Sequence, residues 1–241
     1  VDFEFHKIHS PGEKVEIDFK GRDTPELGFL DRATGEWTEC QLFGAILCSS
    51  QLFFTEAQPQ EKQSNWFQAM AHGFDYFGGV PKILVMDNAK AMIQRADWWD
   101  PDHNPEFFKI CEHFQIAATP ARPRKPTDKN LIEGALGIFW RWARPKVMQR
   151  QFFSLPELNR FLKELVDDFN LRVQKKYGES RRARFEREEK TLLQPLPAEA
   201  FEIADWKKAK LHPDCHLQVK KNFYSAPYRL RGEELSVRLT P

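Results

Sequence analysis

The chain of 241 residues is long enough for one large domain or two modest ones, and its 41% of hydrophobic residues can close a core. It contains no apolar run long enough to span a membrane, and its four cysteines are widely spaced without a CxxC pair. This cysteine usage argues against a disulfide framework and favours a cytoplasmic location. The net charge of +1 does not by itself indicate a nucleic-acid partner, but the segments 122–129, 141–150 and 172–187 are strongly basic. The sequence begins without Met, and we expect it to be a fragment of a longer protein.

The first part of the chain predicts a three-stranded meander followed by a helix. Residues 14–19 (KVEIDF) alternate apolar and polar side chains as a strand does, and the segments 37–49 and 51–57 are β-rich. Residues 60–77 carry large apolar side chains at helical spacing, and Gly78 marks the end of that helix.

A second group of elements adds strands of a different kind. Residues 82–86 (KILVM) form a short, continuous apolar run, which is typical of a strand that is buried on both faces. A helix over 105–114 and a short strand over 115–119 follow. The resulting order of strands and helices predicts a mixed α/β sheet that is covered by helices.

The rest of the chain predicts helices and then a small β-rich module. Residues 120–126 (PARPRKP) are basic and too rich in proline to be helical, and an amphipathic helix follows them. Its apolar stripe consists of Leu131, Ile132, Ala135, Leu136, Phe139 and Ala143. A capping box at Ser154 starts a second long helix, and residues 181–190 predict a short charged one. Residues 204–241 alternate with period two, which favours a small barrel of SH3 size.

Three acids occupy separate structural positions in this scheme. Asp18 lies within the first strand, Asp87 ends the strand over 82–86, and Glu133 lies in the first turns of the helix after the basic linker. A carboxylate on an otherwise apolar strand is costly unless it is paired or binds a cation. Three such acids can share two Mg²⁺ ions, which stand about 3.5–4 Å apart in two-metal sites. Each acid alone is more often a turn or cap residue, so the spacing by itself leaves metal catalysis open.

Several sequence blocks resemble one known family. The blocks VEIDF, VMDNAK and ARPRKPTDKNLIE, with SLPELNRFL and NFYSAPYRLRG further on, look like the IstA-type transposases of insertion sequence family 21. That family belongs to the superfamily of DDE transposases and retroviral-type integrases. The resemblance implies that Asp18, Asp87 and Glu133 are the DDE triad, which would be both catalytic and metal-binding.

The resemblance also implies a fold and a division of the chain. It implies an RNase H-like catalytic domain over 1–150, in which a three-stranded meander and parallel strands form a mixed sheet flanked by helices. A helical extension over 151–200 and a small SH3-like β-barrel over 201–241 would follow.

The activity implied by the resemblance is metal-dependent DNA transposition. The core would cleave the 3′ ends of an insertion sequence and join them to target DNA by phosphoryl transfer, with two Mg²⁺ ions per site, for which Mn²⁺ can substitute. The implied partners are DNA, further copies of the chain in a dimer or larger complex, and a separate AAA+ ATPase helper of the IstB type. The implied location is the bacterial cytoplasm, in association with the nucleoid and not with a membrane.

Basic and polar residues near the acids are candidate DNA contacts. Lys129 stands one helical turn before Glu133, where it can hold a phosphate or simply form an ion pair. The candidate contacts are Asn88, Lys90, Arg122, Arg124, Lys125, Lys129, Arg141 and Arg144. The arginines of 181–187 suit either a DNA contact or a solvated helix face.

Two other functions stay open at this point. One is an RNase H-like nuclease that hydrolyses DNA without strand transfer. The other is a catalytically inactive DNA-binding or assembly module.

Overall fold

A computed structural model describes residues 9–20, 24–86, 93–95, 102–103, 105–120, 130–201, 205–219 and 221–239 of the chain. The chain divides into two compact units, Val1–Glu199 and Ala200–Pro241. In the described ranges, no helix has the length and apolar composition needed to cross a lipid bilayer.

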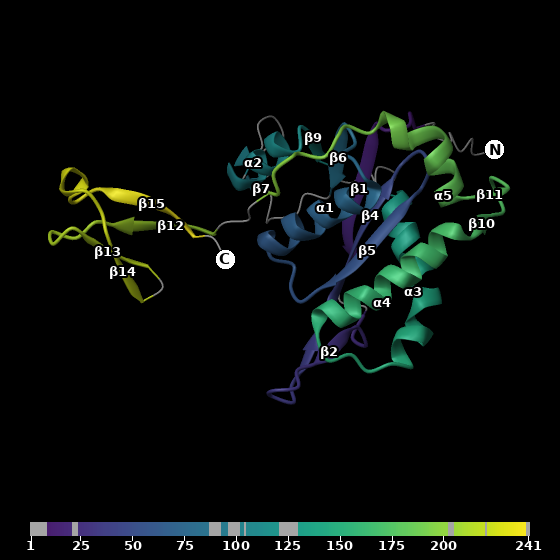
Figure 1. Cartoon of the computed structure of the whole chain (residues 1–241), viewed down its shortest axis with the longest axis horizontal. Helices are drawn as coiled ribbons and strands as arrows, with labels where there is room; N and C mark the ends of the chain where they lie inside the picture. Colours follow the sequence, from purple (N-terminus) through teal and green to yellow (C-terminus); the bar gives the residue numbers. More distant parts are fainter. Residues whose placement is uncertain are drawn as a thin grey trace. The chain divides into compact units, whose positions relative to one another are not determined.

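A five-stranded mixed sheet forms the centre of the larger unit (Figure 1). Its strands lie in the order β5-β4-β1-β6-β9. The pairs β1–β4 and β4–β5 are antiparallel, whereas β1–β6 and β6–β9 are parallel. The predicted mixed sheet is thereby confirmed. The strand bounds are β1 Lys14–Lys20, β4 Gln41–Leu47, β5 Phe53–Gln58, β6 Ile83–Met86 and β9 Ala117–Pro120.

Helices cover both faces of this sheet. They are α1 Gln63–Phe77, α2 Pro105–His113, α3 Asn130–Met148 and α4 Leu155–Leu171. On one face, the Trp66 ring of α1 meets Phe19 of β1 at 4.7 Å and Phe43 of β4 at 5.8 Å between centroids. The helices α3 and α4 pack on the other face. The smaller elements of this unit are β2 Gly28–Leu30, β3 Trp37–Glu39, β7 Ile93–Arg95, β8 Asp102–His103, β10 Val173–Gln174 and β11 Glu179–Ser180.

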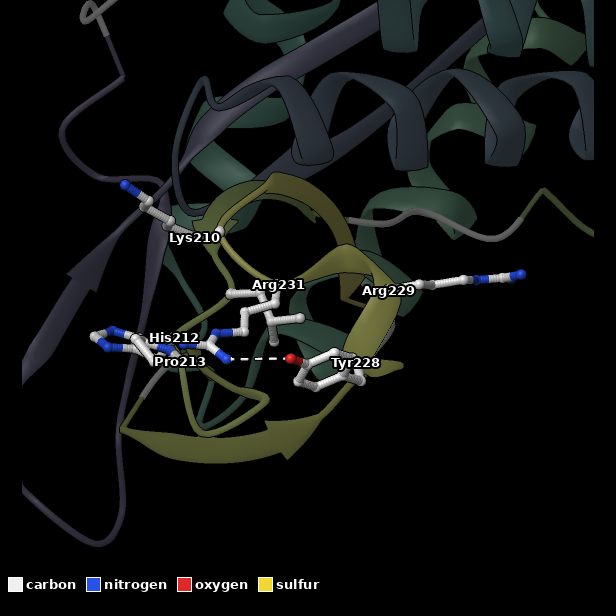
Figure 2. Close-up of a pocket in the computed structure, with 8 residues that line it drawn as sticks. Lys210, His212, Pro213, Tyr228, Arg229 and Arg231 are labelled. Carbon is white, nitrogen blue, oxygen red and sulfur yellow. Dashed lines mark hydrogen bonds between the residues drawn. The ribbon is translucent and has the colours of Figure 1, made fainter.

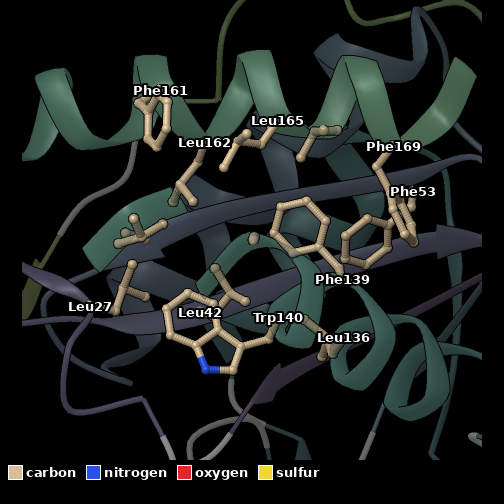
Figure 3. Close-up of a cluster of buried hydrophobic side chains, with 14 of the residues drawn as sticks. Leu27, Leu42, Phe53, Leu136, Phe139, Trp140, Phe161, Leu162, Leu165 and Phe169 are labelled. Carbon is tan, nitrogen blue, oxygen red and sulfur yellow. The ribbon is translucent and has the colours of Figure 1, made fainter. Parts of the chain in front are cut away.

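The main apolar core lies between the sheet, α3 and α4 (Figure 3). At its centre, the ring of Phe139 lies 5.3 Å from that of Phe53 and 5.4 Å from that of Phe169. The contact between Phe139 and Phe169 is edge-to-face, and aromatic pairs of this kind stabilise a core beyond the area that they bury. The apolar stripe predicted for the helix after the linker is confirmed, with Leu131 partly buried beside the core and the other members buried, namely Ile132, Ala135, Leu136, Phe139 and Ala143.

Strand β1 sends alternate side chains to the two faces of the sheet. Phe19 contacts Trp66 of α1. Glu16, on the opposite face, accepts a hydrogen bond from the backbone of Ile132 in α3. Because side chains alternate along a strand, Asp18 points to the same face as Glu16. The sheet therefore presents Asp18 toward the α3 side.

The edge strand β5 is covered by two asparagines of α4. Asn159 accepts the Ala57 N–H at 2.7 Å and donates to the Ala57 carbonyl at 3.1 Å. Asn170, which is fully buried, does the same with Phe53, at 3.1 Å and 2.7 Å. Each amide satisfies one backbone donor and one acceptor that an edge strand would otherwise leave unpaired. We refer to these two residues as the asparagine clamp.

Removing the Asn159 amide, one of the two members of the asparagine clamp, should lower the stability of the fold by a moderate amount. We expect Asn159→Ala to lower the free energy of unfolding by about 1–2 kcal/mol, because the partly buried N–H and C=O of Ala57 lose their partner. Urea titration measures this as a lower midpoint with an unchanged slope. Lys163→Ala, an exposed change on the same helix, is the control. Equal midpoints for the two variants would show that water replaces the amide at no cost.

The segment 181–192 departs from the single charged helix predicted over 181–190. It consists of α5 Arg181–Arg184, a π-helix over Phe185–Glu189 and a 3-10 turn over Lys190–Leu192. The fully buried Glu189 accepts the N–H of Gly12 at 2.9 Å and the N–H of Ser50 at 3.0 Å. We attribute the irregular turns to these long-range bonds, which direct the Glu189 carboxylate into the domain.

The smaller unit contains two two-stranded antiparallel sheets. The pairs are β12 Asp205–Lys210 with β15 Glu234–Leu239, and β13 His216–Val219 with β14 Asn222–Ser225. A 3-10 turn spans Tyr228–Leu230, and Leu211, Leu217 and Val219 form a small core. Strand β14 was not recognised in the sequence because all four of its residues are exposed and show no alternation of burial. The closed SH3-like barrel stays a prediction.

Candidate active site

Asp18 lies in the middle of β1 and is half-buried. Its Oδ1 accepts the N–H of Phe19 at 2.9 Å. In the register of the sheet it lies opposite Gly44 of β4. Opposite residues of an antiparallel pair face the same side, so the missing side chain of Gly44 opens this position to α3. A Cβ atom on Gly44 would lie 2.7 Å from Leu136 Cδ2, which shows how closely α3 approaches the sheet beside Asp18.

Strand β6 ends next to Asp18. Its last residue, Met86, is paired in parallel register with Ile17, the residue before Asp18. Asp87 follows Met86 in the sequence. Asp87, Asn88 and Lys90 lie outside the residues that the structure describes.

The first turn of α3 is tied to β1 by a buried carboxylate. Oε2 of Glu16 accepts the N–H of Ile132 at 3.0 Å, and Ile132 immediately precedes Glu133. Glu133 is exposed in the first turn of α3. The structure therefore brings the elements that carry Asp18 and Glu133 together. Sequence reasoning found both acids but missed Glu16 and Gly44.

The two described acids can act as ligands of a hard cation. Carboxylates offer only oxygen donors, which Mg²⁺ and Mn²⁺ prefer. Asp18 is half-buried on β1, and a bound cation would offset the cost of burying its charge. Within the described part of the chain, which contains Asp18 and Glu133 but not Asp87, no three His, Cys, Asp or Glu side chains form a metal-binding group.

The basic candidates fall into two groups. Arg122, Arg124, Lys125 and Lys129 lie outside the described residues. Arg141 and Arg144 are exposed on α3, where Arg141 Nε donates to the Gly137 carbonyl at 3.3 Å and Arg144 pairs with Glu26.

The arginines of the segment 181–187 are engaged within the unit. Arg181 is buried against the ring of Phe169 at 4.2 Å, and Arg184 donates to the Ser49 carbonyl at 2.8 Å. Arg187 forms an ion pair with Glu179 at 2.5 Å. Arg181 therefore serves packing, whereas Arg187 stays on the surface; a DNA contact by this cluster stays a prediction.

A cavity of about 720 Å³ opens in the smaller unit (Figure 2). Its lining includes Lys210, Arg229 and Arg231. Arg231 lies against Tyr228 and donates to its hydroxyl at 3.4 Å, while Arg229 extends away from that pair. Several cations around one cavity are chemically suited to phosphate. The sequence did not single out these residues, because Lys210 and the two arginines are far apart in the chain and no local pattern predicts that they line one cavity.

Comparison with known proteins shows which proteins this chain resembles. Residues 196–241 match the family described as Mu transposase, C-terminal domain. Over 236 residues the chain is 40% identical to a candidate transposase of Sinorhizobium fredii, which covers 98% of this chain and 45% of that protein. It is 26% identical over 194 residues to the transposase for insertion sequence element IS21 of Pseudomonas aeruginosa, covering 79% of this chain and 48% of that protein.

Over most of its length the chain is therefore similar to insertion-sequence transposases, among them the transposase of IS21. The resemblance to IstA-type transposases that the sequence blocks indicated is thereby confirmed. This transposase-related chain spans about half the length of the curated relatives that it matches.

Comparison with a solved structure identifies the fold of the larger part of the chain. The HTLV-2 integrase catalytic core domain in complex with magnesium matches with a TM-score of 0.51, over 73% of this chain and 98% of that one, at 14% identity. At this level of identity the likeness concerns the fold alone. It confirms that the transposase-related chain has the predicted RNase H-like fold.

Proposed function

We propose that this chain carries the catalytic centre of a DNA transposase, with Asp18, Asp87 and Glu133 as its metal-binding triad. One observation carries the proposal: Glu16 joins β1 to the first turn of α3, so that the elements bearing Asp18 and Glu133 meet. Met86, the last residue of β6, is paired with Ile17, and Asp87 is the next residue in the sequence; this supports Asp87 as the third acid of the triad. The relation to insertion-sequence transposases supplies the class of reaction.

The reaction would be 3′-end cleavage followed by strand transfer. Two Mg²⁺ ions, or Mn²⁺ in their place, would supply activation of the attacking oxygen and stabilisation of the leaving oxygen. The magnesium in the HTLV-2 core structure supports this choice of metal. Asp18 contributes a carboxylate that the sheet holds in place, and Glu133 contributes one that is exposed where DNA can approach. Because both stand on regular elements, little reorganisation is needed when substrate binds.

DNA would be held by cations around these acids. Arg141 and Arg144 extend along the exposed side of α3 beyond Glu133. We propose the same role for Asn88, Lys90, Arg122, Arg124, Lys125 and Lys129. Contacts of this kind bind phosphate and position the duplex without reading its sequence. Each one should steepen the salt dependence of binding.

The partners follow from the relation to transposases. We propose that the chain acts as a homo-oligomer that pairs two transposon ends, and that a separate AAA+ ATPase of the IstB type assists it. The location would be the cytoplasm, in association with the nucleoid.

A joining assay tests the proposed function. The chain is incubated with Mg²⁺, a supercoiled plasmid and labelled duplexes with free 3′-hydroxyls, taken from the DNA that flanks its gene. We expect label to become covalently attached to the plasmid, and EDTA to abolish the attachment. Shortened duplexes without joined product would show a nuclease instead. Binding without either product would show a non-catalytic module.

A further inference from the structure

A buried glutamate lies on the same strand and the same face as Asp18. Glu16 is only 4% exposed, and its carboxylate accepts hydrogen bonds from two segments that are far from it in the chain. Its two oxygens have different donors. Oε2 accepts the Ile132 N–H at 3.0 Å, and Oε1 accepts the Cys48 thiol at 3.8 Å. Burying a carboxylate is costly, so its presence here calls for a reason beyond filling space.

Glu16 accepts a hydrogen bond from one of the N-terminal backbone N–H groups of α3. The first backbone N–H groups of α3 have no acceptor within the helix, and Ile132 is the third residue of α3. A carboxylate at this end also meets the positive end of the helix dipole. Glu16 therefore acts as a cap supplied from a strand 116 residues away. It fixes where the first turn of α3 stands on the sheet.

The second oxygen is held by a thiol that stays protonated. Burial, with the neighbouring Glu16 carboxylate as a further cause, raises the pKa of Cys48 well above its usual range. The thiol therefore remains a donor at neutral pH. Cys48 directly follows β4, so the Glu16 side chain is held on one side by the β4 end and on the other by α3.

Helix α3 also packs closely against β4 at Gly44, beside the hydrogen bond between Glu16 and Ile132. A Cβ atom on Gly44 would lie 2.7 Å from Leu136 Cδ2 and 3.0 Å from Ile132 Cδ1, so α3 rests almost on the strand backbone. Gly44 pairs with Asp18, and Ile132 precedes Glu133. A small shift of the first turn of α3 would therefore change the separation of Asp18 and Glu133.

From these contacts we infer that Glu16 is a positioning residue for the metal-binding acids: by binding the Ile132 N–H it sets the place of Glu133 relative to Asp18. This inference rests on the proposed function. Glu16 itself is not required to touch metal or DNA. Partners that orient metal ligands in this way typically contribute about 10–100-fold to metal affinity or activity.

The test uses a substitution that removes both acceptors and keeps the length of the side chain. In Glu16→Met we expect the joining rate at saturating Mg²⁺ to fall about 10–100-fold. The Mg²⁺ concentration for half-maximal joining should rise, and the KM for DNA should stay unchanged. Calorimetric titration with Mn²⁺ in the absence of DNA should show weaker binding. Glu16→Gln, which keeps one acceptor oxygen, should lie between Met and wild type.

The matched control is Glu56→Met. Glu56 is similarly buried, at 7% exposure, but it pairs with His72 at 2.9 Å and faces α1. We expect it to lower stability while leaving the metal dependence of joining unchanged. A folded Glu16→Met chain with the wild-type rate and wild-type Mn²⁺ affinity would overturn the inference.

Two further outcomes are decided in the same experiment. If Glu16→Met does not fold, amide exchange in the wild-type chain decides: we expect Ile132 to be protected, and exchange as fast as at Leu131 would overturn the inference. If the wild-type chain neither joins DNA nor binds Mn²⁺, the proposed function fails and the role of Glu16 fails with it. Joining by wild type together with an unaffected Glu16→Met chain refutes only the role of Glu16.

Discussion

Glu133→Gln should abolish Mg²⁺-dependent joining while leaving the thermal unfolding midpoint of the chain unchanged. The substitution keeps the size of the side chain but replaces a charged oxygen ligand with a neutral amide. Since outer partners of a metal site already contribute about 10–100-fold, loss of a ligand should cost about 100-fold or more in rate. Glu133 is exposed, so the fold should not depend on its charge. The rate of plasmid joining, measured beside a melting curve, checks both statements.

The control for this prediction is Glu164→Gln, an exposed glutamate on α4 that lies on another helix. It should join DNA at the wild-type rate. If Glu133→Gln joins DNA as fast as this control, Glu133 is not the third metal ligand.

Glu189→Ala should be the most damaging single change to stability outside the apolar core. The side chain is fully buried, and each of its oxygens accepts a different backbone N–H, from Gly12 and from Ser50. Hydrogen bonds to a charged group contribute about 1.5–3 kcal/mol each, so we expect a loss of about 3 kcal/mol or more. Urea unfolding measures it as a large fall in the midpoint.

Two further variants test whether the loss of stability comes from the buried hydrogen bonds of Glu189. Glu189→Gln keeps one acceptor oxygen and should lose an intermediate amount. Glu186→Ala lies in the same π-helical segment but is exposed, and it should change the midpoint very little. Equal losses of stability in Glu189→Ala and Glu186→Ala would mean that the buried hydrogen bonds of Glu189 contribute nothing specific.

The regular elements follow closely from local patterns. Alternation over 14–19 predicted β1, which the structure extends by one residue to Lys20. The capping box at Ser154 is confirmed in part: its side chain accepts the Glu157 N–H at 3.3 Å, whereas the Glu157 carboxylate accepts from Phe153. Helix α1 begins at Gln63 and not at Gln60, and its first residues offer no side-chain cap that could have marked the start.

The features that could not be predicted depend on residues far apart in the chain. Glu16 gains its role from Ile132, 116 residues away, and Glu189 gains its role from Gly12, 177 residues away. No local periodicity encodes such pairs. The arginines of 181–187 show the converse, because a basic run alone does not distinguish a surface cluster from one like Arg181 that is buried against Phe169.

The asparagine clamp has a consequence for how copies of this chain can associate. An open sheet edge offers a neighbouring molecule a ready template for adding a strand, and uncontrolled addition leads to aggregation. At Phe53 and Ala57 the outward N–H and C=O groups of β5 are already occupied by amides from α4. Strand addition by a second copy at this edge of the sheet is therefore opposed at Phe53 and Ala57.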